Sequence, residues 1–292
     1  MPLIHAEPFR ARYYECDAHG HLTNLTYLRW MQEAAFAAST AAGYDFARYT
    51  GLGHVWLVRE TRLDFLAPVR YADDVVVRTW VADFRRSHSR RRYDFVRAGS
   101  GEIAVRASTD WVYLELPALR PVSVPPAMQR AFCPEGTAAP EASRERFPAS
   151  PPAPPGAFAL RTRVDWRAID SMWHVNNAMY LAYLEEAGLR LGEALGWPMA
   201  RLLREGIGMA AREQQIEYRL PAQLDDELEV TTWFSGIRRA TALQHYTICR
   251  TADGALLARA RTRWVWVDLK TRQPIRIPPE FSAALSPFVS QE

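Results

Sequence analysis

The chain has 292 residues, of which 48% are hydrophobic and 12% aromatic, enough apolar side chain for the cores of about two domains. No run of about 18 apolar residues occurs, so the sequence predicts no membrane-spanning helix. Its first residues lack the basic-then-apolar pattern of a secretory signal, so we expect a cytoplasmic protein. The three cysteines are scattered, which argues against a disulfide framework.

The basic residues are almost all arginine, because Lys270 is the only lysine in a chain with a net charge of +3. Five arginines crowd into residues 85–92. Nucleic-acid binding would require such a group to be accompanied by stacking aromatics or a known reader motif, and none is present. We therefore expect a small anionic ligand and no nucleic acid.

In chain order, the first half predicts a short strand, a long helix and then a set of strands. Residues 9–15 read as the strand, and the helix extends from Asn24 to about Ala42, with Gly43 as its stop signal. The segments that follow are rich in Val, Thr, Tyr, Trp and Phe, and they cover residues 54–66, 74–84, 90–98 and 103–115. One long helix against a curved antiparallel sheet is an α+β arrangement.

A proline-rich segment separates this half from the second. Residues 133–157 contain seven prolines, which predicts an extended linker with no core of its own. We therefore divide the chain into residues 1–132, the linker 133–157, and residues 158–292.

The second half repeats the first at a constant offset of 153 positions, as Asp17 and Asp170 show. The offset continues without a gap through the strands, so we interpret the chain as a tandem duplication. The repeated unit carries a polar motif, with members Asp17, His21, Asn24 and Tyr27 in the first copy and Asp170, His174, Asn177 and Tyr180 in the second.

The motif stands where a strand ends and a helix begins. A helix start offers unpaired backbone N–H groups that can bind an oxygen gaining negative charge, and a nearby carboxylate can act as nucleophile or activate water. Acyl transfer at a thioester carbonyl needs this pairing. Each residue also has a structural interpretation: an N-cap or turn for the Asp and Asn, a hydrogen-bonded loop residue for the His, and helix packing for the Tyr. A metal site is not expected, because Cys16 and His19 have no matching ligands in the second copy.

These residues resemble the hotdog-fold thioesterases. Arg-Tyr-Tyr-Glu-Cys-Asp17 with Tyr27-Leu-Arg-Trp-Met is similar to the 4-hydroxybenzoyl-CoA thioesterase group. Asp170-x-x-x-His-Val-Asn-Asn-x-x-Tyr180 resembles long-chain acyl-CoA thioesterases and the catalytic half of plant acyl-ACP thioesterases. The resemblance implies two tandem hotdogs, each a long helix wrapped by a curved antiparallel sheet, packed as an intrachain pseudo-dimer.

The resemblance also implies roles for individual residues. It makes Asp17 and Asp170 the catalytic carboxylates, and it places the oxygen-binding amides near His21–Asn24 and His174–Asn177. It assigns the phosphates of coenzyme A to arginines near the third and fourth strands, which are Arg85, Arg86, Arg238 and Arg239. A solvated hairpin end is the alternative for these arginines. Gly20 and Thr23 are replaced by Trp173 and Asn176 in the second copy, so we expect the two sites to be unequal.

The leading interpretation is hydrolysis of an acyl-CoA to a carboxylic acid and a free thiol. No cofactor is expected beyond the coenzyme A or phosphopantetheine that belongs to the substrate. An acyl-ACP thioesterase, with an acyl carrier protein as partner, and a non-catalytic acyl-thioester-binding protein are the alternatives. A hydratase is disfavoured because its Tyr-x-Asp-x-Asn-Pro-x-His element is absent. Assembly of such double hotdogs into a homo-oligomer is left open.

Overall fold

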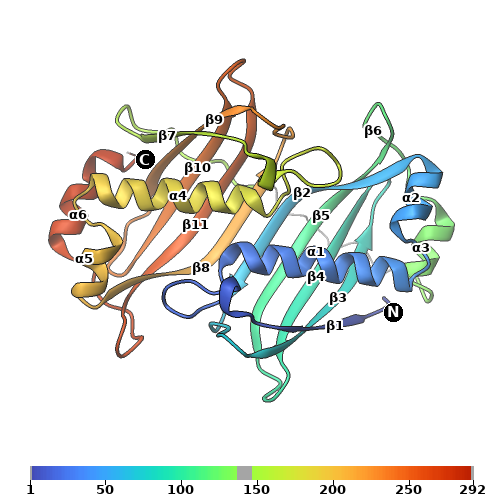
Figure 1. The fold of residues 1–292 in the computed structure, drawn as a ribbon, viewed down its shortest axis with the longest axis horizontal. Coiled ribbons are helices and arrows are strands. Elements are labelled where there is room, and N and C mark those ends of the chain that lie inside the picture. The colour runs from blue at the N-terminus through green and yellow to red at the C-terminus, as the bar shows by residue number, and fades with distance from the viewer. Residues whose placement is uncertain (1, 137–146, 291–292) are drawn as a thin grey trace. The chain divides into compact units, whose positions relative to one another are not determined.

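The computed structural model describes residues 2–136 and 147–290. The described chain forms two compact units that divide between Arg146 and Phe147. Each unit contains one long helix and one antiparallel sheet (Figure 1). We describe the units separately.

In the first unit the long helix is α1 (Asn24–Ala41). Its five main strands lie in the order β1-β3-β4-β5-β2, and each neighbouring pair is antiparallel. They are β1 (His5–Arg10), β2 (His54–Phe65), β3 (Asp74–Phe84), β4 (His88–Arg97) and β5 (Ile103–Glu115). The short strand β6 (Arg120–Pro121) pairs with β5, and the helices α2 (Phe46–Leu52) and α3 (Pro126–Phe132) complete the unit.

The second unit repeats this order around the long helix α4 (Met179–Ala194). Its strands lie in the order β7-β9-β10-β11-β8, again antiparallel throughout. They are β7 (Phe158–Arg163), β8 (Ile207–Tyr218), β9 (Glu227–Ser235), β10 (Thr241–Arg250) and β11 (Leu256–Asp268). The remaining helices are α5 (Met199–Arg204) and α6 (Pro279–Leu285).

The predicted long helix and the four strands after it are confirmed to within two residues at each end. The first strand is the exception, because β1 ends at Arg10 and residues Tyr13–Glu15 form a 3₁₀ turn. The Arg12 N–H donates to Glu15 Oε2 at 3.0 Å, and this local bond takes the backbone out of the sheet ladder. The short helices were not predicted, although α3 and α6 each begin with a proline at their first position, a recognisable start signal.

The proline-rich segment is divided by the structure. Its middle, residues 137–146, lies outside the described residues. From Phe147 onward the segment packs on the second unit, because the Phe147 ring is 5% exposed and lies 4.6 Å from the guanidinium carbon of Arg259. The Ser290 hydroxyl donates to the carbonyl of Pro152 at 2.8 Å. The second half of the predicted linker therefore has a fixed place against unit two.

A buried histidine on β10 makes the stability of the second unit sensitive to acid. The His245 side chain is 2% exposed, its Nε2 lies 2.7 Å from the Ser235 hydroxyl, and its ring stacks on Trp233. Burial, and secondarily the charge of Arg261, lower the pKa of His245 from 6.5 to about 4. The neutral imidazole is therefore the form that the folded protein holds near neutral pH.

We expect the free energy of unfolding to fall by about 3 kcal/mol as the pH drops from about 6.5 to about 4, because only the unfolded state binds the His245 proton in that window. The variant His245→Gln keeps a partner for Ser235 without a titrating ring. Urea unfolding between pH 7 and pH 4 should show a shallower acid loss for the variant. Parallel stability curves for the two proteins would contradict the assignment.

Candidate functional site

The Asp-His motif forms a tight backbone turn in both units. In the first unit the Asp17 N–H donates to the His21 carbonyl at 2.7 Å, and a bridge between Cys16 and Leu22 closes the turn. In the second unit the Asp170 N–H donates to the His174 carbonyl at 3.0 Å. The repeated Asp and His are therefore first of all the two ends of one main-chain turn.

The Asp17 carboxylate is exposed and is held by the turn itself. Its Oδ1 accepts hydrogen bonds from the N–H groups of His19 at 2.8 Å and His21 at 2.9 Å. Among the residues that the structure describes, no donor reaches Oδ2. One carboxylate oxygen is thus anchored, and the other is available to a water or a substrate.

The matching Asp170 is half-buried and bonded differently. Its Oδ1 accepts from the Met172 N–H at 2.9 Å, and its Oδ2 accepts from Asn176 Nδ2 at 3.3 Å. The first unit has Thr23 in place of Asn176, and the Thr23 hydroxyl pairs with Thr26 rather than with Asp17. The two copies therefore differ, as expected, in the donors that hold their carboxylates.

The repeated asparagines do not cap the long helices. The Thr23 hydroxyl accepts from the Thr26 N–H at 3.3 Å, and Asn176 Oδ1 accepts from the Ala178 N–H at 3.0 Å. Asn24 is already the first residue of α1, whereas Asn177 precedes α4 by two residues. The structural interpretation of Asn24 and Asn177 as caps is wrong, because the N-cap residues are Thr23 for α1 and Ala178 for α4.

Counting the amides of the turn identifies the donor that is left for a ligand. In the first unit the N–H groups of His21, Leu22 and Thr23 donate to Asp17 Oδ1, the Val69 carbonyl and the Glu15 carbonyl. Within the described part of the chain, the N–H of Asn24 has no acceptor. Asn24 is half-buried, and a helix-start N–H without an acceptor is suited to bind an oxyanion.

In the second unit the N–H of Asn177 is likewise without an acceptor among the described residues. Those of Val175 and Asn176 donate to the carbonyls of Ala222 and Ala168. The imidazoles of His21 and His174 are half-buried, and their part in the chemistry stays a prediction.

The repeated tyrosines hold the neighbouring loop in place. Tyr27 and Tyr180 are 2% and 3% exposed, and their hydroxyls accept the N–H of Val69 at 3.3 Å and of Ala222 at 2.9 Å. Burial raises the pKa of each phenol to about 12, so neither ionises near neutral pH. This agrees with helix packing rather than acid–base chemistry.

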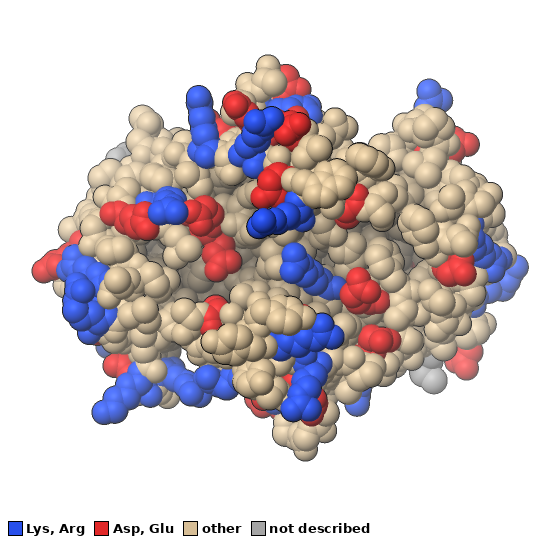
Figure 2. Space-filling model, viewed as in Figure 1, with Lys and Arg blue, Asp and Glu red and all other residues tan. Residues whose placement is uncertain are grey.

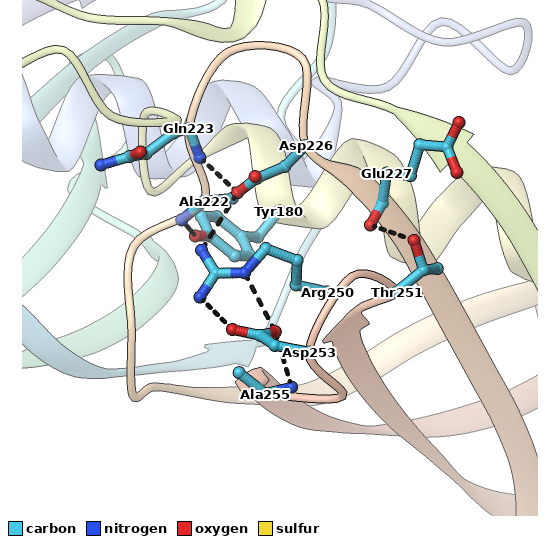
Figure 3. Close-up of polar contacts among 9 residues, drawn as sticks. All are labelled: Tyr180, Ala222, Gln223, Asp226, Glu227, Arg250, Thr251, Asp253 and Ala255. Atoms are coloured by element: carbon cyan, nitrogen blue, oxygen red, sulfur yellow. Dashed lines mark hydrogen bonds and ion pairs between the residues drawn. The ribbon is translucent and has the colours of Figure 1, made fainter.

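An aspartate and an arginine lock the same loop from the other side. In unit two Asp226 Oδ2 accepts from the Gln223 N–H at 2.9 Å and pairs with Arg250 at 3.4 Å, and Arg250 also binds Asp253 (Figure 3). In unit one Asp73 accepts from the Arg70 N–H at 2.9 Å and pairs with Arg97. The sequence marked these residues only as repeat matches, and the constant offset was the signal that could have assigned them.

The four arginines predicted to bind phosphate lie in exposed turns. Arg85 and Arg86 connect β3 to β4, and Arg238 and Arg239 connect β9 to β10. The first pair stands at the end of the 11-residue β3, whereas the Asp17 turn lies near the start of that strand, roughly 33 Å away. Within a unit the structure does not bring the arginines to the aspartate, and their role stays a prediction.

Three further observations concern surface charge, metal ligands and membrane-spanning helices. Figure 2 shows positive and negative side chains interspersed on the face in view, without the continuous basic stripe that nucleic acid would need. In the described ranges, no cluster of three or more His, Cys, Asp or Glu residues is arranged to hold a metal ion. No helix in those ranges is both long and apolar enough to cross a membrane.

The second turn contains a strained residue. Trp173 has a φ of +61°, a left-handed conformation that bulky residues rarely adopt, and Gly20 takes the same place in the first unit with a φ of +72°. The Trp173 side chain is 69% exposed, and its ring meets the exposed ring of Trp166 edge-on, with centroids 6.0 Å apart. The substitution of a glycine by Trp173 adds strain beside Asp170 with little burial in return.

Comparison with known proteins places both units in one family. The sequence matches the thioesterase-like superfamily over residues 11–132 and again over residues 164–285. It is similar to the long-chain acyl-CoA thioesterase FadM of Escherichia coli K12, with 31% identity over 135 residues, covering 44% of this chain and 99% of that protein.

A plant protein and a solved structure match across both units. The chloroplastic acyl-[acyl-carrier-protein] hydrolase FATB2 of Cuphea viscosissima is 24% identical over 271 residues, which are 90% of this chain but only 63% of that protein. The 12:0-ACP thioesterase from Umbellularia californica superposes with a TM-score of 0.72 at 20% identity, covering 89% of this chain and 93% of that one. That likeness shows the fold, and the expectation of two tandem hotdog units is confirmed.

The variant Trp173→Gly should raise the free energy of unfolding by about 1 kcal/mol, because it removes the positive-φ strain at a position that is mostly exposed. The matched variant Gly20→Ala should lower it by a similar amount, because it adds a side chain at the same backbone conformation. Urea unfolding measures both changes. A loss of stability in Trp173→Gly would show that the contact with Trp166 outweighs the strain.

Proposed function

We propose that this chain, which belongs to the thioesterase-like superfamily, hydrolyses acyl thioesters to a carboxylate and a free thiol. The observation that carries the proposal is the same in both units: an anchored Asp carboxylate lies in the turn before the long helix, and the N–H of Asn24 or Asn177, at or just before that helix, has no acceptor among the described residues. FadM and FATB2, to which the chain is similar, are named as thioester hydrolases of acyl-CoA and of acyl carrier protein.

The carboxylate supplies the attack. Asp17 is held through Oδ1 by two backbone N–H groups, so Oδ2 is free to take a proton from water or to attack the thioester carbonyl itself. With water as the nucleophile, the tetrahedral centre expels the thiolate, which takes up the proton held by the Asp, and the carboxylic acid is released. With the Asp as the nucleophile, the thiolate leaves and an acyl–Asp anhydride forms, which water then hydrolyses to the acid and the free Asp. Asp170 is placed to do the same in the second unit, where each of its two carboxylate oxygens already accepts one hydrogen bond.

The helix start stabilises the charge that develops. The N–H of Asn24, and of Asn177 in the second unit, donates to the carbonyl oxygen as that oxygen becomes an oxyanion. The positive end of the helix dipole strengthens this interaction. A donor that is already in place reorganises little during the reaction, which is the source of its catalytic effect.

Acyl-CoA is the substrate we propose first, because FadM is named for it and matches over 99% of its own length. Acyl carrier protein is the second candidate, favoured by the match to FATB2 over both units. Either substrate would place the reaction in fatty acid metabolism. The exposed pairs Arg85–Arg86 and Arg238–Arg239 are the groups we assign to the carrier phosphates, since guanidinium forms a planar fork that fits them. The pairing of the two units as an intrachain pseudo-dimer stays a prediction.

The variants Asp17→Asn and Asp170→Asn should each lower kcat/KM for acyl-CoA, by unequal amounts, and the double variant should lose about 10²- to 10⁴-fold. Asn keeps the oxygen that accepts the turn's N–H groups, so the fold should persist. Thiol release, followed with a colorimetric thiol reagent on acyl-CoAs and acyl carrier proteins, measures the effect.

The exposed Asp74, replaced by Asn, is the control and should retain the wild-type rate. Equal, unchanged rates in both single variants and in the double variant would refute the Asp assignment. The absence of thiol release from every CoA and carrier-protein substrate would refute the hydrolase itself and leave a non-catalytic binding protein.

A further inference from the structure

Each unit has a buried polar position on β4 or β10, facing its long helix. In the second unit it is Gln244, which is 2% exposed. A Cβ added to Gly188 of α4 would lie 3.9 Å from Gln244 Nε2, so the helix passes directly over this side chain. The 153-residue offset places Arg91 at the same position in the first unit.

Gln244 is fully engaged by its own unit. Its Nε2 donates to the Thr232 hydroxyl at 2.9 Å, and its Oε1 accepts from Trp264 Nε1 at 2.7 Å. A neutral amide with donor and acceptor both satisfied can be buried at little cost. The second unit therefore has a closed polar layer beneath its helix.

Arg91 is not engaged in this way. The side chain is 6% exposed, and within the described part of the chain its one hydrogen bond is from Nη1 to the Thr79 hydroxyl at 3.3 Å. The ring of Phe132 lies 5.6 Å from its guanidinium carbon. A guanidinium has five N–H donors, so most of its hydrogen-bonding capacity is unused.

Among the residues that the structure describes, no carboxylate pairs with this buried charge. The titratable groups that act on Arg91 are Tyr93, Tyr49 and Cys133, and burial lowers the pKa of the guanidinium. The buried Asp83 on the neighbouring strand lies 3.9 Å from Arg85 instead. An isolated buried cation is costly unless an anion joins it, and a bound carboxylate would supply that anion.

The position of Arg91 indicates where that ligand ends. Phe95 lies on the same face of β4 and packs against Tyr27 near the start of α1, and Arg91 is four residues away, about 13 Å along the strand. Tyr49 interacts electrostatically with Arg91, and its hydroxyl lies 3.1 Å from the Ser39 hydroxyl. Ser39 lies about 18 Å beyond Tyr27 along α1.

The Asn24 amide and Arg91 therefore lie toward opposite ends of the same helix. Between Tyr27 and Ser39 the side chains that α1 buries are apolar, namely Leu28, Trp30, Met31, Ala34, Ala35 and Ala38.

We propose that Arg91 binds a carboxylate at the far end of the acyl group, so that the first unit selects monothioesters of dicarboxylic acids. The inference rests on the proposed thioesterase function and names its substrate class. The thioester carbonyl lies at the Asn24 amide, the methylene chain follows the apolar face of α1, and the terminal carboxylate meets the guanidinium fork bidentately. A plain fatty acyl chain of the same length would leave Arg91 without its anion.

The test compares wild type with Arg91→Gln, which introduces the residue found at this position in the second unit. The control is Arg78→Gln, which removes an exposed arginine from the neighbouring strand β3. Substrates are the CoA thioesters of hexadecanedioic and dodecanedioic acids, their monocarboxylic counterparts, and the ω-hydroxy analogues. Wild type and Arg78→Gln should prefer a dicarboxylic substrate by about 10- to 100-fold in kcat/KM. Arg91→Gln should lose that preference while keeping its rate on the monocarboxylic thioester.

Thermal unfolding separates recognition from support of the fold. Arg91→Gln should keep or raise the Tm, because it removes an unpaired buried charge, and the free dicarboxylate should raise the Tm of wild type alone. Absence of a preference in wild type, a preference for the ω-hydroxy analogue, or an equal loss on all substrates with a lower Tm would overturn the proposal. If no thioester is cleaved, the hydrolase proposal fails, and stabilisation by the free dicarboxylate still decides the role of Arg91.

Discussion

A hydrogen bond from a loop N–H to a buried tyrosine hydroxyl is the constraint on which each candidate site depends. Tyr27 and Tyr180 stand in the first turns of their helices, with rings in the core and hydroxyls on Val69 and Ala222. A buried N–H that loses its acceptor costs about 1–3 kcal/mol, so the loop cannot easily leave the helix. The same loop residue presents its carbonyl to the Asp-His turn, which places the turn relative to the helix start.

This constraint explains how the catalytic pairing arises. The loop and the preceding 3₁₀ turn take up the amides that follow the motif histidine, one after another. The amide of Asn24 is the first that they do not reach, and the Asp carboxylate is fastened by the turn rather than by a side chain. A site built from main-chain groups keeps its geometry when its side chains change, so duplication can preserve the frame while the chemistry diverges.

The two copies diverge at positions that leave this frame intact. Asn176 reaches the carboxylate of Asp170, while Thr23 caps its helix without doing so. Beneath the helices, the neutral Gln244 is hydrogen-bonded within its own unit, whereas Arg91 is a buried cation without a paired anion among the described residues. These differences assign separate tasks to the units: the first carries the feature that reads an acyl tail, and the second carries a closed core.

The sequence by itself determined the duplication, the order and extent of the long helix and main strands, and the two turns that carry Asp, His and Asn. Hydrophobic periodicity and a constant offset between repeats are properties of the linear sequence, so they can be recognised without the structure. It could not determine that the N-cap residues are Thr23 and Ala178, rather than Asn24 and Asn177, because a cap depends on where the backbone leaves the helical conformation.

Only the tertiary structure decided which amides remain without acceptors and which buried charge lacks a counterion. Partners such as Val69 and Leu22 are distant in sequence, and they meet because strands and helix pack around one core. Arg91 reads in the sequence as one of five crowded arginines, and packing beneath α1 is what separates it from the exposed ones. Hydrogen bonding and desolvation depend on every neighbour in space, and a linear pattern does not contain those neighbours.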